Sequence, residues 1–268
     1  GRSVSFRATP TIARVPRKLI LLLFALLALA ASAPPASAGT PPGIPGVDVS
    51  RFQGAIGWMR MARESDIRFA FVQASRGRGP DCPVVPARCG VDEWYDENYW
   101  QAKAAGIRVG PYHRAFIGGH GRRTVKRDAR KEARVFIDSV GVLVPGDLRP
   151  ALDIETPFGE KLKPRHLKLW VDVWLRKVER AFGVKPLIYT NNSSWNAFGQ
   201  TQRYARKGHP LWVAHWHVKN PLVPAGDWGG ASWTVWQWRS DGRVPGVKGN
   251  VDMNWLRGEL TAISLGGV

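Results

Sequence analysis

Two acidic residues, Asp153 and Glu155, lie at the end of an apolar run at residues 148–154. Strand side chains i and i+2 share one face, with Cα atoms roughly 6 to 7 Å apart, so the spacing predicts that both carboxyl groups point the same way. Two converging carboxyl groups oppose each other's ionisation, so one keeps its proton above the ordinary pKa of Glu while the other stays anionic. Such a pair suits acid-assisted glycoside cleavage. The same spacing also occurs at solvated strand ends and helix caps.

The elements that would position this pair alternate along the chain from residue 46 onward. Apolar runs predict strands at 46–49, 69–74, 108–112, 149–154, 187–190, 211–214 and 233–238, with a short eighth at 250–254. Apolar residues at helical spacing predict helices that include 56–64, 93–105, 124–140 and 165–182. This repeated order favours a parallel α/β fold, and about 220 residues in one series fit a single barrel.

Polar residues fall at the C-terminal ends of several predicted strands, which form the functional face of a parallel barrel. They are Asp48, Tyr112, Asp153, Glu155, Tyr189 and Asp252. Because separate strands would bring them to one face, we expect a common site, although some would only cap strand ends. His113, which follows Tyr112, is expected to be a satisfied residue at the barrel end.

Tryptophan is abundant, with 13 residues, and six of them crowd into 212–238. Aromatic faces suit sugar rings, but the large apolar area of each ring predicts core or rim packing for most of them. Alternation in the strand at 233–238 separates Gln237 from its two Trp neighbours. Trp212, Trp216 and Gln237 are counted among the candidate substrate-binding residues.

The first 38 residues carry five basic residues, no acidic residue, an apolar run at 19–33 and a final Ala36-Ser37-Ala38. This is typical of a secretory signal peptide, followed by a Pro-rich linker at 39–45 and a folded domain at 46–268. A retained membrane anchor is the alternative, but the apolar run is short for a span of roughly 20 residues. We therefore expect export to the periplasm or the cell exterior, without stable membrane insertion.

Removal of those five basic residues lowers the formal net charge from +18 to +13, so an acidic partner is expected. Nucleic acid, an anionic membrane and an anionic cell-wall polymer would all fit. Export counts against nucleic acid, and the sequence holds no recognisable nucleic-acid motif. The basic residues at 122–131 equally fit the solvated face of a helix.

Cys82 and Cys89, the only cysteines, are predicted to form a local disulfide in an oxidising compartment. No His lies near enough in the sequence to complete a metal site with them. His209, His215 and His217 include a His-x-His pair, but no zinc signature accompanies it. Neither a metal nor another cofactor is expected.

The order of short motifs resembles that of the glycoside hydrolase family 25 lysozymes, the N-acetylmuramidases of the Chalaropsis type. The segments that carry the resemblance, in family order, are 46–50 (GVDVS), 52–54 (FQG), 69–75 (FAFVQAS), 105–113 (AGIRVGPYH), 152–155 (LDIE), 188–190 (IYT), 211–214 (LWVA), 236–237 (WQ) and 251–254 (VDMN). The resemblance implies a modified TIM-type (β/α)8-like barrel. It also implies hydrolysis of the β-1,4 bond between N-acetylmuramic acid and N-acetylglucosamine in peptidoglycan. We expect the protein to be a monomer.

The resemblance also implies roles for single residues. Glu155 would protonate the leaving oxygen and later activate water. Asp153 would either attack the anomeric carbon or orient the 2-acetamido group of the substrate, and the family favours the second route. Asp48 and Asp252 would tune proton affinity or hold the sugar, while Tyr112 and Tyr189 would line the reacting subsite.

Two positions depart from the family pattern. Arg76 stands where the family usually has an acidic residue, and Trp216 where it commonly has Tyr. Arg76 would hold a carboxylate of the substrate, or pair with Glu93 or another acid. Two other functions stay open: a chitinase-like amino-sugar hydrolase, which lacks support in the residues before Glu155, and a non-catalytic wall-binding barrel, which has no need of the acid pair.

Overall fold

Among the residues that the computed structural model describes (43–79, 89–159 and 162–266), eight strands close into a barrel. They are β1 (Ile44–Val49), β2 (Phe69–Arg76), β4 (Arg108–Arg114), β5 (Ala151–Asp153), β6 (Leu187–Thr190), β7 (Leu211–Ala214), β8 (Val235–Gly242) and β9 (Val251–Leu256). The ring closes because β1 pairs with both β2 and β9. The short β3 (Gly90–Val91) pairs with the end of β2 alone. The predicted barrel is confirmed.

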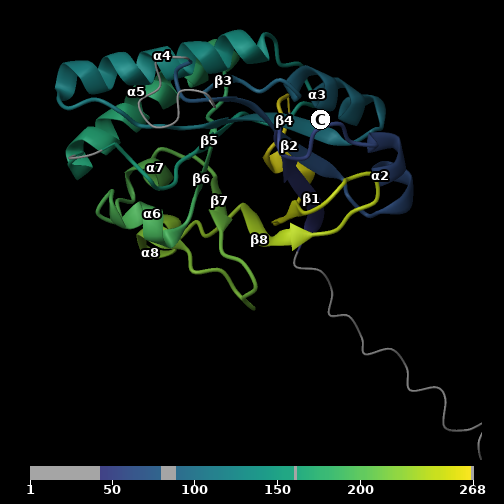
Figure 1. Cartoon of the computed structure of the whole chain (residues 1–268). Helices are drawn as coiled ribbons and strands as arrows, with labels where there is room; N and C mark the ends of the chain where they lie inside the picture. Colours follow the sequence, from purple (N-terminus) through teal and green to yellow (C-terminus); the bar gives the residue numbers. More distant parts are fainter. Residues whose placement is uncertain (1–42, 80–88, 160–161, 267–268) are drawn as a thin grey trace, which may run out of the picture. The chain divides into compact units, whose positions relative to one another are not determined.

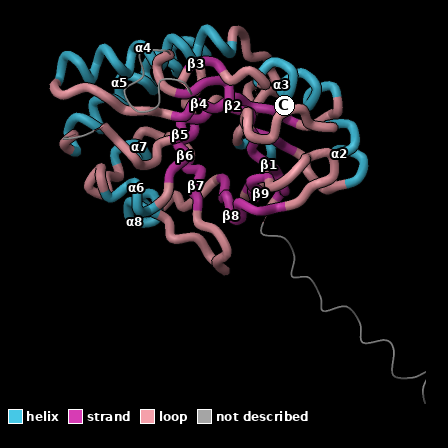
Figure 2. The backbone as a smooth tube through the Cα atoms, in the orientation of Figure 1, coloured by secondary structure: helices cyan, strands magenta, loops and turns pink. Residues whose placement is uncertain are grey.

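The helices lie outside the ring of strands (Figure 1; Figure 2). They are α2 (Trp58–Glu64), α3 (Tyr95–Ala104), α4 (Arg122–Val140), α5 (Pro164–Phe182), α6 (Asn192–Asn196), α7 (Arg203–Arg206), the left-handed turn α8 (Pro224–Gly229) and the 3₁₀ turn η2 (Leu260–Ala262). Helix α5 shows how the sequence determines where a helix begins and ends. Pro164 occupies its first turn, where no N–H is needed, and Gly183 ends it in the left-handed conformation.

Strand β9 runs antiparallel to both of its neighbours, whereas the other barrel strands run parallel. The prediction of a purely parallel series is therefore wrong at this strand. The connection at 243–250 holds no helix and is too short for a crossover, so the chain returns antiparallel. Asp252, near the start of β9, pairs in register with Asp48 near the end of β1, and so lies at the carboxyl end of the parallel strands.

Side chains alternate between the barrel interior and the layer beneath the helices. Phe71, Tyr189 and Trp212 belong to the interior cluster, and Trp170 and Trp174 of α5 belong to the outer one. Eight of the 13 tryptophans are buried: Trp58, Trp170, Trp174, Trp195, Trp212, Trp228, Trp233 and Trp236. This confirms the prediction that most of them pack in the core.

A buried polar group ties α4 to the barrel. His113 and Glu132 are both completely buried, with Nε2 and Oε2 2.9 Å apart, and Ser75 Oγ lies 2.9 Å from His113 Nδ1. Burial lowers the pKa of His113 to about 3 and raises that of Glu132 well above its ordinary value, so burial favours the uncharged form of both groups. The expectation that His113 is a satisfied residue at the barrel end is confirmed.

Two predicted features lie wholly or partly outside the described residues. The predicted signal peptide at 1–38 lies outside the described residues, and β1 begins at Ile44, inside the predicted linker. Cys82, one partner of the predicted disulfide with Cys89, is also outside them. Within the described ranges, no helix combines the length and apolar character needed to cross a membrane.

The barrel interior leaves no room for a side chain at Gly110 of β4. A Cβ there would lie 2.6 Å from Leu148 Cβ and 3.1 Å from the Phe71 ring. Gly110→Ala should therefore lower the free energy of unfolding by about 1–3 kcal/mol, measured by urea denaturation. Gly121→Ala is the control, because a Cβ at Gly121 meets nothing within 4 Å. Equal losses in both variants would contradict this account of the interior.

Candidate active site

A cavity of about 170 Å³ opens at the carboxyl end of the barrel strands. Each of the eight barrel strands described above contributes to its wall, and the full lining is Asp48, Ser50, Phe52, Gln73, Arg76, Tyr112, Arg114, Asp153, Glu155, Tyr189, Trp212, Gln237 and Asp252. Every residue predicted for the catalytic or substrate-binding site is present except Trp216. The fold thus brings together side chains from distant parts of the sequence.

The predicted acid pair lies in this cavity, but not on one strand. Strand β5 ends at Asp153, where its pairing with β4 and β6 stops, and Glu155 follows in the loop. The prediction of a shared strand face is wrong for this reason. The side chain of Asp153 is 9% exposed and that of Glu155 is 30% exposed, so Glu155 is the more accessible of the two.

Arg114 contacts both carboxyl groups. Its Nη1 donates to Asp153 Oδ1 at 3.3 Å, and its Nε lies 3.3 Å from Glu155 Oε1. The same guanidinium donates to the carbonyl oxygens of Glu155 (3.1 Å) and Thr156 (3.3 Å), which fixes the loop after β5. Arg114 was not among the predicted site residues, although it follows Tyr112 by two residues on β4 and alternation would have placed it on the same face.

Crowding of acids in the cavity changes their ionisation. Burial raises the pKa of Asp153 well above its ordinary value, while the charge of Arg114 opposes this rise. Burial raises the pKa of Asp48 to about 6, against two hydrogen bonds that lower it. Burial, followed by the charges of Asp48, Glu155 and Asp153, raises the pKa of Asp252 to about 9. At neutral pH the cavity therefore retains protons that isolated carboxyl groups would have lost.

Two buried amides hold the carboxyl group of Asp48 on β1. Gln237 Nε2 and Asn254 Nδ2 each donate to Asp48 Oδ2 at 2.8 Å. Gln237 Oε1 accepts from the hydroxyl of Tyr189 (2.9 Å), and Asn254 Oδ1 accepts from Trp212 Nε1 (2.8 Å), so both amides have fixed orientations. Asn254 was not among the predicted site residues, although it follows Asp252 by two on β9.

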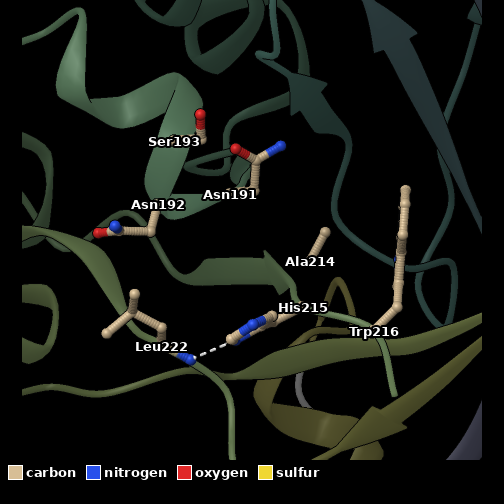
Figure 3. Close-up of a pocket in the computed structure, with 7 residues that line it drawn as sticks. All are labelled: Asn191, Asn192, Ser193, Ala214, His215, Trp216 and Leu222. Atoms are coloured by element: carbon tan, nitrogen blue, oxygen red, sulfur yellow. Dashed lines mark hydrogen bonds between the residues drawn. The ribbon is translucent and has the colours of Figure 1, made fainter. Parts of the chain in front are cut away.

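Trp216 lies in a second pocket, of about 370 Å³, beside the loops after β6 and β7. Figure 3 shows its lining: Asn191, Asn192, Ser193, Ala214, His215, Trp216 and Leu222. The ring of Trp216 is 45% exposed, and its Nε1 donates to Gln237 Oε1 at 2.8 Å. Gln237 therefore joins this pocket to the cavity that holds the acid pair.

The histidines considered as metal ligands have separate partners. His209 Nδ1 lies 3.0 Å from the carbonyl oxygen of Pro186, and His215 Nδ1 accepts from the backbone N–H of Leu222 at 2.8 Å (Figure 3). His217 Nε2 lies 3.6 Å from a carboxylate oxygen, that of Asp241. In the part of the chain that the structure describes, no group of three or more His, Cys, Asp or Glu residues could hold a metal ion.

The raised pKa of Asp252 predicts a pH-dependent cost to stability. Between its ordinary value of 3.8 and the folded value of about 9, the unfolded chain has lost a proton that the folded protein keeps. The free energy of unfolding therefore falls as pH rises through this range. Asp252→Asn removes this dependence. At pH 8 the free energy of unfolding of the variant should therefore exceed that of wild type by about 1 kcal/mol or more, and at pH 4 the variant should not be stabilised.

Urea denaturation of wild type and Asp252→Asn at both pH values tests this prediction. Asp66→Asn is the control, because the side chain of Asp66 is 95% exposed, at the surface. A difference between wild type and Asp252→Asn that is the same at pH 4 and pH 8 would show that Asp252 carries no such charge penalty.

Comparison with known proteins places this site in a family. The model of glycosyl hydrolases family 25 matches residues 47–247. YegX of Escherichia coli K12 is 31% identical over 223 residues, which cover 81% of this chain and 71% of that protein. Lysozyme M1 of Streptomyces globisporus is 30% identical over 231 residues, which cover 82% of this chain and 70% of that protein.

A solved structure agrees with the sequence matches. The crystal structure of the bacterial lysozyme from Streptomyces coelicolor aligns with a TM-score of 0.69 and 31% identity, over 82% of this chain and 97% of that one. The agreement therefore covers most of this chain. The chain belongs to glycosyl hydrolases family 25 and is a glycoside hydrolase.

Proposed function

We propose that this protein is a muramidase, which cleaves the β-1,4 bond between N-acetylmuramic acid and N-acetylglucosamine in peptidoglycan. The observation that carries the proposal is the pair of carboxyl groups, Asp153 and Glu155, held by Arg114 in the cavity of a family 25 barrel. Two relatives at 30% and 31% identity bear the name lysozyme, which supports the same substrate.

Glu155 is the proton donor in this proposal. Of the two carboxyl groups it is the more exposed, so it can reach a glycosidic oxygen at the mouth of the cavity. It gives its proton to the leaving oxygen as the glycosidic bond breaks, and then takes a proton from the water that attacks the anomeric carbon. The contacts of Arg114 with the loop at Glu155 and Thr156 support this position.

Asp153 is proposed to orient the 2-acetamido group of the substrate. The carbonyl oxygen of that group would then attack the anomeric carbon as the leaving oxygen departs, and water would later reopen the ring so formed. A hydrogen bond from Arg114 withdraws electron density from the Asp153 carboxylate, which makes direct attack by Asp153 less favourable. Direct attack remains the competing route for the same residue.

The other lining residues are proposed to bind the sugar. Burial raises the pKa of Tyr112 and Tyr189 well above 10, so both keep their hydroxyl protons. The hydroxyl of Tyr112 accepts from Gln73 Nε2 and can donate to the sugar, whereas that of Tyr189 donates to Gln237 and can accept from the sugar. Asp48 and Asp252 offer carboxyl groups, and Trp212, buried below them, supports the cavity floor. The exposed ring of Trp216 offers an apolar face to the next sugar along the glycan.

Peptidoglycan as substrate also supports export to the periplasm or the cell exterior. The signal-like sequence of residues 1–38 and the basic charge of the remaining chain favour action on an anionic wall polymer. We propose that the protein acts there as a monomer, without stable membrane insertion. No nucleic-acid partner is included in this proposal.

Removal of the proton donor tests the proposed function. Glu155→Gln should reduce the release of soluble muropeptides from purified peptidoglycan by about 10²-fold or more, because glutamine cannot protonate the leaving oxygen. The matched control is Glu64→Gln, which makes the same chemical change on the exposed surface of α2 and should keep wild-type activity.

Chitin is tested in parallel to separate a muramidase from a general amino-sugar hydrolase. The proposal requires release from peptidoglycan to exceed release from chitin. Equal muropeptide release by wild type and Glu155→Gln would end the proposed mechanism, and equal turnover of both polymers would end the proposed substrate.

A further inference from the structure

Arg76 is a second guanidinium in the cavity, and it forms no ion pair with any residue that the structure describes. Its Nε and Nη1 atoms are buried and make no hydrogen bond with any described residue. The alternative in which Arg76 pairs with Glu93 is wrong, because Glu93 lies 3.3 Å from Arg51 Nη2 instead. Buried charged groups in proteins are normally paired, so an unpaired guanidinium in a substrate cavity points to a ligand group.

An irregularity in β2 aims Arg76 into the cavity. The register between β2 and β4 shifts between Gln73 and Ser75. Gln73 lines the cavity, whereas Ser75 contacts His113 in the outer layer. Strict alternation from Gln73 would have put residue 76 in the outer layer, and the extra residue returns Arg76 to the cavity side.

Two aromatic rings fix the guanidinium of Arg76. Its Cζ lies 5.2 Å from the ring centroid of Phe116 and 5.9 Å from that of Phe52. Such contacts stabilise a cation without using its N–H donors. Phe116 is buried and Phe52 is largely exposed, so the rings run from the interior toward the mouth of the cavity. These contacts leave Nε and Nη1 without a hydrogen-bond partner among the described residues, in a side chain that lines the cavity.

The neighbouring arginines, Arg114 and Arg51, both form ion pairs with acidic residues. Arg114 is paired with Asp153 and Glu155, and Arg51 with Asp92 and Glu93. Arg76 alone of these three arginines has no acidic partner among the described residues. A planar guanidinium with free donors matches a carboxylate, which can accept two parallel hydrogen bonds.

We propose that Arg76 binds a carboxylate borne by the glycan and thereby determines which glycans this enzyme accepts. The inference rests on the proposed muramidase function and names the substrate group that the enzyme selects. In peptidoglycan that carboxylate has two sources: the lactyl group of an N-acetylmuramic acid without its peptide, or the stem peptide. A polymer of N-acetylglucosamine alone carries neither, so Arg76 favours muramic acid polymers over chitin.

The test measures kcat and KM of wild type and Arg76→Gln on three substrates. These are solubilised peptidoglycan with its stem peptides, the same glycan stripped of peptides by an amidase, and the stripped glycan with its carboxyl groups reduced to alcohols. Arg76→Gln should raise KM about tenfold or more on a carboxylate-bearing glycan, with kcat within about threefold of wild type. On the reduced glycan the two proteins should have equal kcat/KM.

Two further variants separate recognition from folding or net charge. Arg76→Lys keeps the charge but not the planar donors, so it should recover part of the lost affinity for the carboxylate-bearing glycan. Arg60→Gln removes one positive charge from the exposed surface of α2 and should behave as wild type. A KM effect on the stripped glycan identifies the lactyl carboxylate, and an effect on the intact substrate alone identifies the stem peptide.

Two results would overturn the inference. One is an unchanged KM of Arg76→Gln on both carboxylate-bearing glycans. The other is an equal loss on the reduced glycan, which would show that Arg76 acts only on the structure of the cavity. A wild-type protein without activity on any muramic acid glycan would instead overturn the proposed function, and the inference with it.

Discussion

The contact of Arg114 with two carboxyl groups is the interaction on which the site depends. Asp153 and Glu155 lie in one cavity with Asp48 and Asp252, and four acids so close together repel one another when ionised. Arg114 supplies positive charge at the pair and also binds the backbone of the loop that carries Glu155. The same residue thus offsets the repulsion and fixes the geometry of the two groups proposed to act on the substrate.

The closed barrel makes this contact possible, because Arg114 and Asp153 lie in register on the neighbouring strands β4 and β5. The antiparallel course of β9 completes the opposite wall, where Asn254 and Gln237 bind Asp48. The carboxyl group of Asp48 accepts hydrogen bonds from these two amides, and burial raises its pKa to about 6. Asp48 therefore titrates close to neutral pH.

Much of the site could be predicted because strand ends converge in a barrel, and the family order of motifs predicted the fold. The same reasoning could have predicted Arg114 and Asn254, because each follows a predicted site residue by two positions on its strand. Arg76 was recognised as a departure, but its place in the cavity depends on the shift in β2, which alternation alone cannot predict. The end of β5 at Asp153 likewise depends on its neighbours, because strand pairing sets where a strand stops.

The charge of Arg114 lowers the pKa of Asp153, and the pH profile of kcat/KM for peptidoglycan hydrolysis tests this effect most directly. Loss of the cation in Arg114→Gln removes the interaction that lowers the pKa of Asp153. The acidic limb of the profile should therefore move to higher pH, whether or not the maximal rate also falls. A profile of unchanged shape, with activity only scaled down, would contradict the account.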